Sequence, residues 1–362
     1  MSELTDTCQD LRRRVRDLVA EWDFTPRCDS WASGYDPDFS QELGRRGLLA
    51  VTWPKEFGGA EGTNVDRFAV SEELLRAGAP VAAHWVGERQ IGPSLLRHGT
   101  RELQEEFCPP LARAEYRFAL GMSEPDAGSD LAAVRTKAVR DGDSWRVTGR
   151  KIWTSGAHRA THLYLLARTS QEEDKHAGLT EFIVSMDSPG ITVSPILDLR
   201  GEHHFNEVVL EDVHVPGRWV IGDIGAGWPQ VVGQLSFERG GPERFLSTYP
   251  LLTAVLRANL ADDTARRELR ALAGRLQVLR RWTLENARAM DAGHTPSTHA
   301  AMSKYLGNKF ERDVIAWARP LMPRADRSIR ALYDQAVAAS PASGIRGGAA
   351  QVMLSVIAKG KK

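Results

Sequence analysis

Cysteine is scarce in this sequence, with three residues among 362, at Cys8, Cys28 and Cys108. Their odd number and wide spacing argue against a disulfide framework and favour a reducing compartment. No apolar run approaches the roughly 18 residues that a membrane-spanning helix needs. The first residues, MSELTDTCQD, lack the apolar segment of a secretory signal. We therefore expect a soluble, cytoplasmic protein that does not bind a membrane.

An excess of charge of either sign is also lacking. Lys plus Arg and Asp plus Glu both number 47. A balanced chain has no global electrostatic attraction to nucleic acid or to an anionic membrane. A neutral or anionic small molecule is the better expectation for a partner.

Two parts of the chain show helical periodicity, with apolar residues recurring every three or four positions. One part precedes about residue 117 and the other follows about residue 228, and loops such as Trp53 to Gly59 interrupt the first. The repeats include Leu11, Val15, Leu18 and Trp22, then Leu269, Leu272, Leu276 and Leu279, then Met302, Leu306, Phe310, Val314 and Trp317.

The middle of the chain changes to short apolar runs that alternate or are bounded by turn residues, which is typical of β-strands. Asp141-Gly142-Asp143 is a tight-turn sequence between residues 136–139 and 144–148, so these two runs are predicted to pair as a hairpin. The sequence therefore predicts an α+β chain with an N-terminal helical domain (1–117), a middle β domain (118–227) and a C-terminal helical bundle (228–362).

Two short segments next to this hairpin carry side chains suited to a ligand. GMSEPDAGSDL, residues 121–131, contains Ser123, Gly128 and Ser129, but by itself it reads as an ordinary turn. GRKIWTSGAH, residues 149–158, places Trp153 beside two hydroxyl side chains. A flat apolar face next to hydrogen-bond donors fits a planar ring such as a flavin, although a lone strand Trp is more often core.

Histidine does not form a recognisable metal site. His158 and His162 are four residues apart, but they fall in a strand-and-turn region without an acidic third ligand nearby. We therefore expect no metal. His203-His204 lies late in the β domain and receives no role from the sequence.

Together the two segments closely resemble those that hold the FAD isoalloxazine in the acyl-CoA dehydrogenase family. The resemblance covers almost the whole chain and implies a helical domain, a β-barrel and a four-helix bundle. It implies that Ser155 reaches flavin N5, that Trp153 lies against the ring and that Ser129 touches the substrate thioester arm. The cofactor contacts it assigns are Met122, Ser123, Gly128, Ser129, Trp153, Thr154 and Ser155.

The resemblance also indicates where to look for the catalytic base. Many relatives carry a Glu just before a Gly-Thr pair near the C-terminus, where this chain has Gly347 before Gly348-Ala349. A second branch of the family carries its Glu before an Arg in the first helix of the bundle, which matches Glu238 and Arg239. Glu238 is the predicted base, with Ser236 and Arg239 near the CoA moiety.

Pro242 leaves an alternative for the base open. If the helix continues through it, Pro242 cannot donate a hydrogen bond to the carbonyl of Glu238, and a kink is expected there. If a helix instead restarts at Pro242, Glu243 becomes the second candidate.

The activity implied by the resemblance is FAD-dependent α,β-dehydrogenation of an acyl-CoA or acyl-carrier thioester. The implied electron acceptor is an electron-transfer flavoprotein or oxygen. Two bundle segments with which relatives clasp a neighbour's FAD, Arg-x-Gln-Phe-Gly and Gly-Gly-x-Gly, are missing between Leu251 and Ser340. The resemblance implies a homo-oligomer or a hetero-oligomer with a related subunit. Two alternatives stay open: a non-catalytic partner subunit, and a related flavin oxidase with a non-CoA substrate.

Overall fold

The computed structural model describes residues 5–360, except for the side chains of residues 235–238. The chain divides into two compact units. A helical unit contains Met1–Phe39, Glu61–Ala82 and Leu235–Lys362, and a sheet unit contains Ser40–Ala60 and Ala83–Gln234. Helices precede and follow the strands along the chain, which confirms the predicted mixed α+β class. The proposed domain boundaries at 117 and 227 stay predictions.

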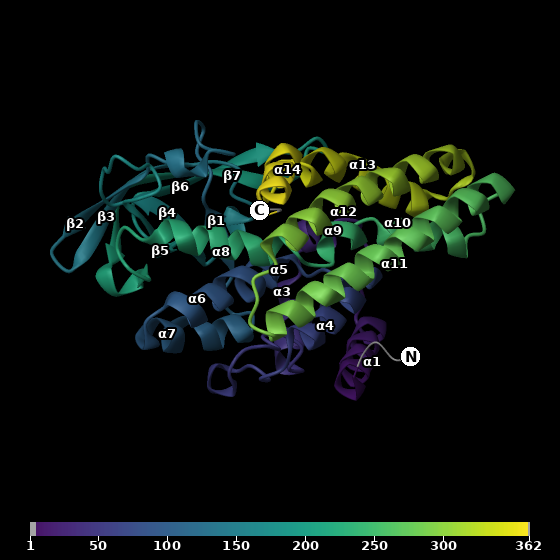
Figure 1. Cartoon of the computed structure of the whole chain (residues 1–362), viewed down its shortest axis with the longest axis horizontal. Helices are drawn as coiled ribbons and strands as arrows, with labels where there is room; N and C mark the ends of the chain where they lie inside the picture. The colour runs from purple at the N-terminus through teal and green to yellow at the C-terminus, as the bar shows by residue number, and fades with distance from the viewer. Residues whose placement is uncertain (1–4, 361–362) are drawn as a thin grey trace. The chain divides into compact units, whose positions relative to one another are not determined.

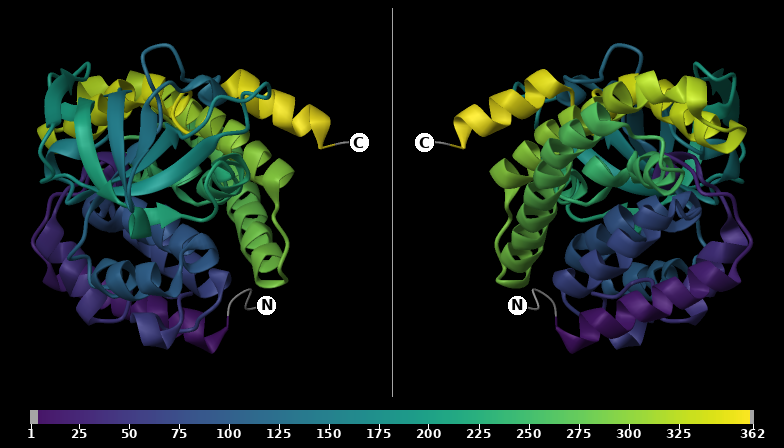
Figure 2. Two further views of the ribbon diagram at one scale, coloured as in Figure 1. Left: turned by 90° about the vertical axis from the view of Figure 1, so that its left-hand side faces the viewer. Right: turned by 90° about the vertical axis from the view of Figure 1, so that its right-hand side faces the viewer.

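The sheet unit contains an eight-stranded sheet, drawn in blue and teal in Figures 1 and 2. Along the sheet the order is β6-β7-β3-β2-β4-β5-β8, and β1 pairs with β4. The strands are β1 (Phe118–Gly121), β2 (Lys137–Asp141), β3 (Ser144–Lys151), β4 (His162–Arg168), β5 (Leu179–Ser185), β6 (Ile191–Leu197), β7 (His203–Pro216) and β8 (Val220–Ile221).

The predicted hairpin is present. β2 and β3 pair antiparallel, with Asp141 opposite Ser144. Gly142 lies in the turn with a φ of 58°, a left-handed conformation that glycine adopts without strain. β3 pairs on its other side with β7, so the end of β3 is held by long-range pairing.

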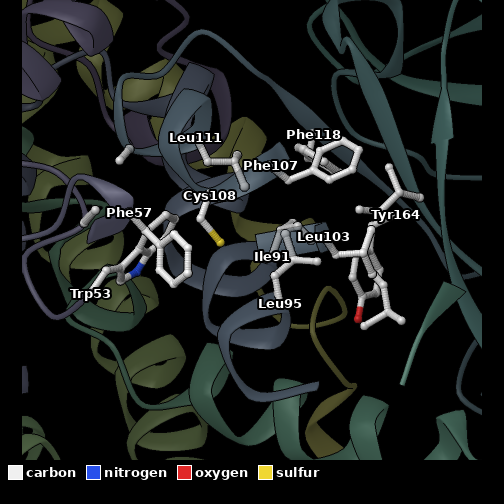
Figure 3. Packing of buried hydrophobic residues seen from close by; sticks show 14 residues of the cluster. Trp53, Phe57, Ile91, Leu95, Leu103, Phe107, Cys108, Leu111, Phe118 and Tyr164 are labelled. Carbon is white, nitrogen blue, oxygen red and sulfur yellow. The ribbon is translucent and has the colours of Figure 1, made fainter. Parts of the chain in front are cut away.

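Helices of the sheet unit pack against the strands through a large apolar cluster (Figure 3). They are α6 (Gly92–His98) and α7 (Arg101–Ala112), preceded by α5 (Ala82–Val86) and a π-helical turn at Gly87–Ile91. Leu95 and Phe107 from these helices share the cluster with Tyr164 of β4 and with Trp53. Gly92 is required here, because a Cβ at this position would overlap the Trp53 ring.

The helical unit is assembled from α1 (Asp6–Glu21), α4 (Asn64–Ala77) and the helices of the C-terminal third. α1 packs against α4, α4 against α11, and α11 against α12. Glu72 of α4 is buried and accepts hydrogen bonds from Arg12 of α1 and from Arg280 of α11, whose Nε lies 2.6 Å from Oε1. A carboxylate between two guanidinium groups therefore ties three helices together.

Further helices follow the strands along the chain, and the first of them, α8, begins in the sheet unit and ends in the helical unit. They are α8 (Gly227–Arg239), α9 (Glu243–Leu246), α10 (Tyr249–Arg257), α11 (Asp263–Asp291), α12 (Ser297–Ala318), α13 (Arg327–Ser343) and α14 (Ala350–Lys359). Two further helices, α2 (Ser30–Ser33) and α3 (Pro37–Arg45), lie near the N-terminus. No helix among the described residues is long and apolar enough to cross a membrane.

Candidate functional site

A buried ion pair joins the two segments that the sequence singles out. Lys151, the last residue of β3, is fully buried, and its Nζ lies 2.8 Å from Oε1 of Glu124 and 3.1 Å from the carbonyl oxygen of Met122. Burial lowers the pKa of Lys151 to about 8, against the opposing effect of Glu124. The pair therefore remains ionised at neutral pH and holds residues 122–124 against the end of β3.

Both carboxylate oxygens of Glu124 accept hydrogen bonds in this arrangement. Its carboxylate also accepts from the backbone amides of Arg135, at 2.6 Å, and Thr136, at 2.9 Å. Burial opposes its ionisation, but the Lys151 charge and these hydrogen bonds hold the pKa of Glu124 below its usual value. Its role is to fix the loop after β1.

The two candidate segments touch directly. The amide of Ile152 donates to the carbonyl of Ser123 at 2.9 Å, so Ser123 lies next to the segment that contains Trp153. Met122 and Ser123 are half-buried, while Gly128 and Ser129 lie on the exposed side of the following turn. The structure thus brings the predicted residues of the two segments into one region.

Trp153 has an unusual backbone and an unusual exposure. Its φ is 60°, in the left-handed region that a bulky residue enters only at a cost of roughly 1–2 kcal/mol. Its side chain is 57% exposed, and its ring lies nearly perpendicular to that of Phe205, with ring centroids 5.7 Å apart. A strained residue that presents a large aromatic face is typical of a ligand-binding position.

The residues after Trp153 supply polar groups and open space. Thr154 is buried, and its hydroxyl has no hydrogen-bond partner within the described part of the chain. Ser155 is exposed. No atom lies within 4 Å of where a Cβ would stand on Gly156 or Gly128. An aromatic face, unused hydroxyls and uncrowded glycines fit the ring of a flavin, so the residues present are compatible with FAD.

Sequence reasoning missed three residues next to this segment: Asn206 and the stacked rings of His158 and His203. The buried Asn206 amide donates from Nδ2 to the carbonyl of Thr154 at 2.8 Å. The contact joins residues about fifty positions apart, and a single Asn in a strand carries no pattern that reveals it. The neighbouring His203-His204 pair was the available signal.

The candidate base lies outside the described side chains, as does Ser236. Glu238 and Ser236 belong to α8, whose last residue, Arg239, donates from Nε to the carbonyl of Gly347 at 3.0 Å. α8 ends at Arg239 and α9 begins after Pro242, so the helix restarts rather than kinks. The second candidate, Glu243, is buried, and its Oε1 lies 3.3 Å from Nε of Arg244.

The turn at residues 346–348, where many relatives of the resembled family carry their Glu, is held by cations. Lys304 is fully buried and donates to the carbonyl of Arg346 at 2.6 Å and to that of Gly348. Arg346 stacks 4.2 Å above the Trp31 ring and forms a salt bridge with Asp29. Gly347 and Gly348 have φ values of 67° and 105°, so this turn is built for glycine and offers no carboxylate of its own.

Two family models match most of the chain that precedes the bundle. The acyl-CoA dehydrogenase N-terminal domain model matches residues 5–115, and the middle domain model matches residues 119–213. The chain belongs to the acyl-CoA dehydrogenase family.

A curated relative agrees with this family. The chain is 40% identical over 202 residues to the acyl-CoA dehydrogenase IpdE1 of Mycobacterium tuberculosis, covering 56% of this chain and 52% of that protein. The chain spans about half the length of these curated relatives.

Two solved structures match along nearly their whole length. The Tcur3481-Tcur3483 steroid ACAD has a TM-score of 0.88 at 26% identity, covering 99% of this chain and 97% of that chain. The ChsE4-ChsE5 complex from Mycobacterium tuberculosis has a TM-score of 0.84 at 26% identity, with the same coverage of both chains.

The described residues contain no group of three or more His, Cys, Asp or Glu side chains that would hold a metal ion. Nδ1 of His162 hydrogen-bonds to the Thr161 hydroxyl, and its ring stacks on Phe118. Burial lowers the pKa of His162 to about 4. It is a neutral residue of the aromatic core.

Proposed function

We propose that this protein catalyses FAD-dependent α,β-dehydrogenation of an acyl thioester, with residues 121–131 and 149–158 as the flavin site. The observation that carries the proposal is the strained, exposed Trp153 beside Ser155, held next to Ser123 by the Lys151–Glu124 pair. Bound FAD would supply the two-electron acceptor for a hydride from the β-carbon of the substrate.

Each residue of the site has a role in this proposal. Trp153 lies against the flavin ring, and the Ser155 hydroxyl and the Ser123 region supply hydrogen bonds to its polar edge. Ser129 contacts the thioester arm. The cofactor contacts proposed are Met122, Ser123, Gly128, Ser129, Trp153, Thr154 and Ser155.

Glu238 is the proposed base that takes the α-proton, with Ser236 and Arg239 beside the CoA moiety. The burial of Glu243 and its contact with Arg244 favour Glu238 over Glu243, because a base needs a carboxylate that can reach the substrate. The cations around residues 346–348 and the lack of a carboxylate there agree with a base on α8.

The substrate proposed is a bulky acyl-CoA thioester, because one matching structure is named a steroid ACAD. A hetero-oligomer with a related subunit is proposed on the same grounds, since the ChsE4-ChsE5 structure is named a complex. The electron acceptor proposed is an electron-transfer flavoprotein.

The test compares Glu238→Gln with the wild-type chain and with Glu268→Gln, a change at an exposed position of α11. Each protein is loaded with FAD, and the loss of visible flavin absorption is followed anaerobically after adding a steroid side-chain CoA thioester or octanoyl-CoA. Glu238→Gln is expected to retain FAD but to slow reduction by about 100-fold to 10,000-fold, the usual contribution of a general base. Wild-type reduction rates in Glu238→Gln would remove Glu238 from this role.

A further inference from the structure

We infer that Asn206 is a positioning residue for the Trp153–Gly156 segment, and that the stacked rings of His158 and His203 set the orientation of its amide. The inference rests on the proposed function, because the position of this segment affects catalysis only if the segment holds the flavin. All the residues concerned belong to the sheet unit.

Asn206 forms two hydrogen bonds with Thr154. Its side-chain Nδ2 donates to the Thr154 carbonyl at 2.8 Å, and the Thr154 amide donates to the Asn206 carbonyl at 3.0 Å. Asn206 is fully buried within β7 and pairs with Pro195 of β6. The segment is therefore attached to a strand that is itself paired on both sides.

The other end of the Asn206 amide is occupied by two imidazole rings. The rings of His158 and His203 stack with centroids 3.7 Å apart and planes inclined by 21°. Oδ1 of Asn206 lies 2.6 Å from Nε2 of His203 and 3.2 Å from Nδ1 of His158. Because an amide oxygen only accepts, both of these ring nitrogens must carry a proton. The two donors fix the oxygen of the amide on their side and turn Nδ2 toward Thr154.

His158 is compatible with this role at neutral pH. Burial lowers the pKa of His158, and the neighbouring His203 and Arg159 lower it further. A neutral His158 whose Nδ1 donates to Asn206 keeps Nε2 without a proton, and this buried nitrogen meets no partner among the described residues. Among the described residues, the hydrogen bond of the His158 ring therefore goes to Asn206.

The segment needs such a hold because its backbone is strained. Trp153 has a φ of 60°, which a tryptophan keeps only where the surroundings enforce it. On the far side of Thr154, the Gly156 amide donates to the carbonyl of His204 at 3.0 Å. β7 thus fixes both flanks of Ser155, the residue proposed to reach flavin N5. Loss of the hydrogen bond from the Asn206 side chain would let the Trp153 backbone leave its strained conformation and would move the Ser155 hydroxyl.

The test uses three variants of the full chain and one matched control. Asn206→Ala removes both functions of the amide. Asn206→Asp keeps an acceptor for the two imidazoles but places an oxygen opposite the Thr154 carbonyl. His203→Ala removes one donor at a half-buried ring. Thr180→Ala is the control, since Thr180 is a buried polar residue of β5 that bonds to Thr169 and to the Gly225 amide.

Two quantities are measured for each protein: hydrogen–deuterium exchange of the peptide spanning residues 151–158 without FAD, and the dissociation constant for FAD. Asn206→Ala and Asn206→Asp are both expected to raise exchange in this peptide and to weaken FAD binding by about ten-fold or more. His203→Ala is expected to raise exchange by less. Thr180→Ala is expected to leave the exchange of this peptide unchanged.

Unchanged exchange of residues 151–158 in Asn206→Asp and His203→Ala would overturn the inference, even if Asn206→Ala does not fold. Equal increases in the Thr180→Ala control would overturn it as well, because they would show a general loss of stability. A wild-type chain that binds no FAD would contradict the proposed function, while the exchange data would still decide whether Asn206 holds the segment.

Discussion

Nζ of Lys151 lies 2.8 Å from Oε1 of Glu124, in the interior of the sheet unit, and this pair links the loop after β1 to the end of β3. Replacing Lys151 by Met leaves the Glu124 carboxylate buried without its cation. The free energy of unfolding of the FAD-free chain is expected to fall by roughly 3–5 kcal/mol, as for other broken buried pairs. Urea unfolding measures this loss.

The double variant Lys151→Met/Glu124→Gln is the matched comparison. Because it buries no unpaired charge, it is expected to be more stable than Lys151→Met alone. A double variant whose loss equals the sum of the two single losses would show that the two side chains do not interact, contrary to the structure.

Two substitutions at Trp153 distinguish the effect of backbone strain on stability from the effect of the aromatic ring on FAD binding. Trp153→Gly and Trp153→Ala both remove the aromatic face, so both are expected to weaken FAD binding by about ten-fold or more. Only glycine adopts the left-handed backbone at φ 60° without strain. The free energy of unfolding of Trp153→Gly is therefore expected to be roughly 1 kcal/mol higher than that of Trp153→Ala. Equal stabilities of the two variants, measured by urea unfolding, would count against backbone strain at this position.

Glu181 predicts a pH dependence of stability. Burial raises the pKa of this β5 carboxyl to about 8, against the effect of the Tyr164 hydroxyl, which donates to Oε2 at 2.7 Å. In the unfolded chain the group ionises near its usual value of 4.5, so unfolding releases a proton between pH 4.5 and 8. The free energy of unfolding contributed by Glu181 therefore falls as pH rises through this window.

Glu181→Gln removes this titration. Relative to wild type, the variant is expected to gain roughly 1–3 kcal/mol in the free energy of unfolding between pH 5 and pH 8.5. Burial also raises the pKa of Glu311 to about 8, so part of the fall in the free energy of unfolding with rising pH is expected in both proteins. Urea unfolding at the two pH values checks the expectation, with Glu268→Gln as the exposed control. A wild-type to variant difference that does not change with pH would refute it.

Gly92 and Gly274 form a pair of helix glycines with opposite expectations. A Cβ on Gly92 overlaps the ring of Trp53, whereas a Cβ on Gly274 meets no atom within 4 Å. Gly92→Ala is expected to lower the free energy of unfolding by about 1–3 kcal/mol, and Gly274→Ala to raise it by up to about 1 kcal/mol. Thermal unfolding of both variants measures these changes in stability. A Gly92→Ala protein as stable as wild type would show that the Trp53 ring moves aside without cost.

Local signals accounted for much of the fold. The alternation around Asp141-Gly142-Asp143 predicted the β2–β3 hairpin, and three- and four-residue periodicity predicted the helices that precede and follow the strands along the chain. The hairpin could be read because its turn chemistry is contained in three consecutive residues. The restart of the helix at Pro242 was one of two outcomes that proline chemistry allowed.

The supporting contacts of the site could not be read in the same way. The partner of Lys151 is 27 residues away and that of Thr154 is 52 residues away, and both contacts depend on strand pairings that bring distant residues together. Glu181 lies in an apolar strand, where its neutral state follows from burial and not from its neighbours in the sequence. The residues proposed to face the flavin carried a recognisable pattern, whereas the residues that hold them in place did not.

The most direct test of the account is the visible absorption spectrum of the purified full chain, with FAD quantified per chain after denaturation. We predict flavin absorption bands and a ratio close to one FAD per chain after FAD is added. A colourless protein that remains colourless with excess FAD would contradict the assignment of residues 121–131 and 149–158 as a flavin site.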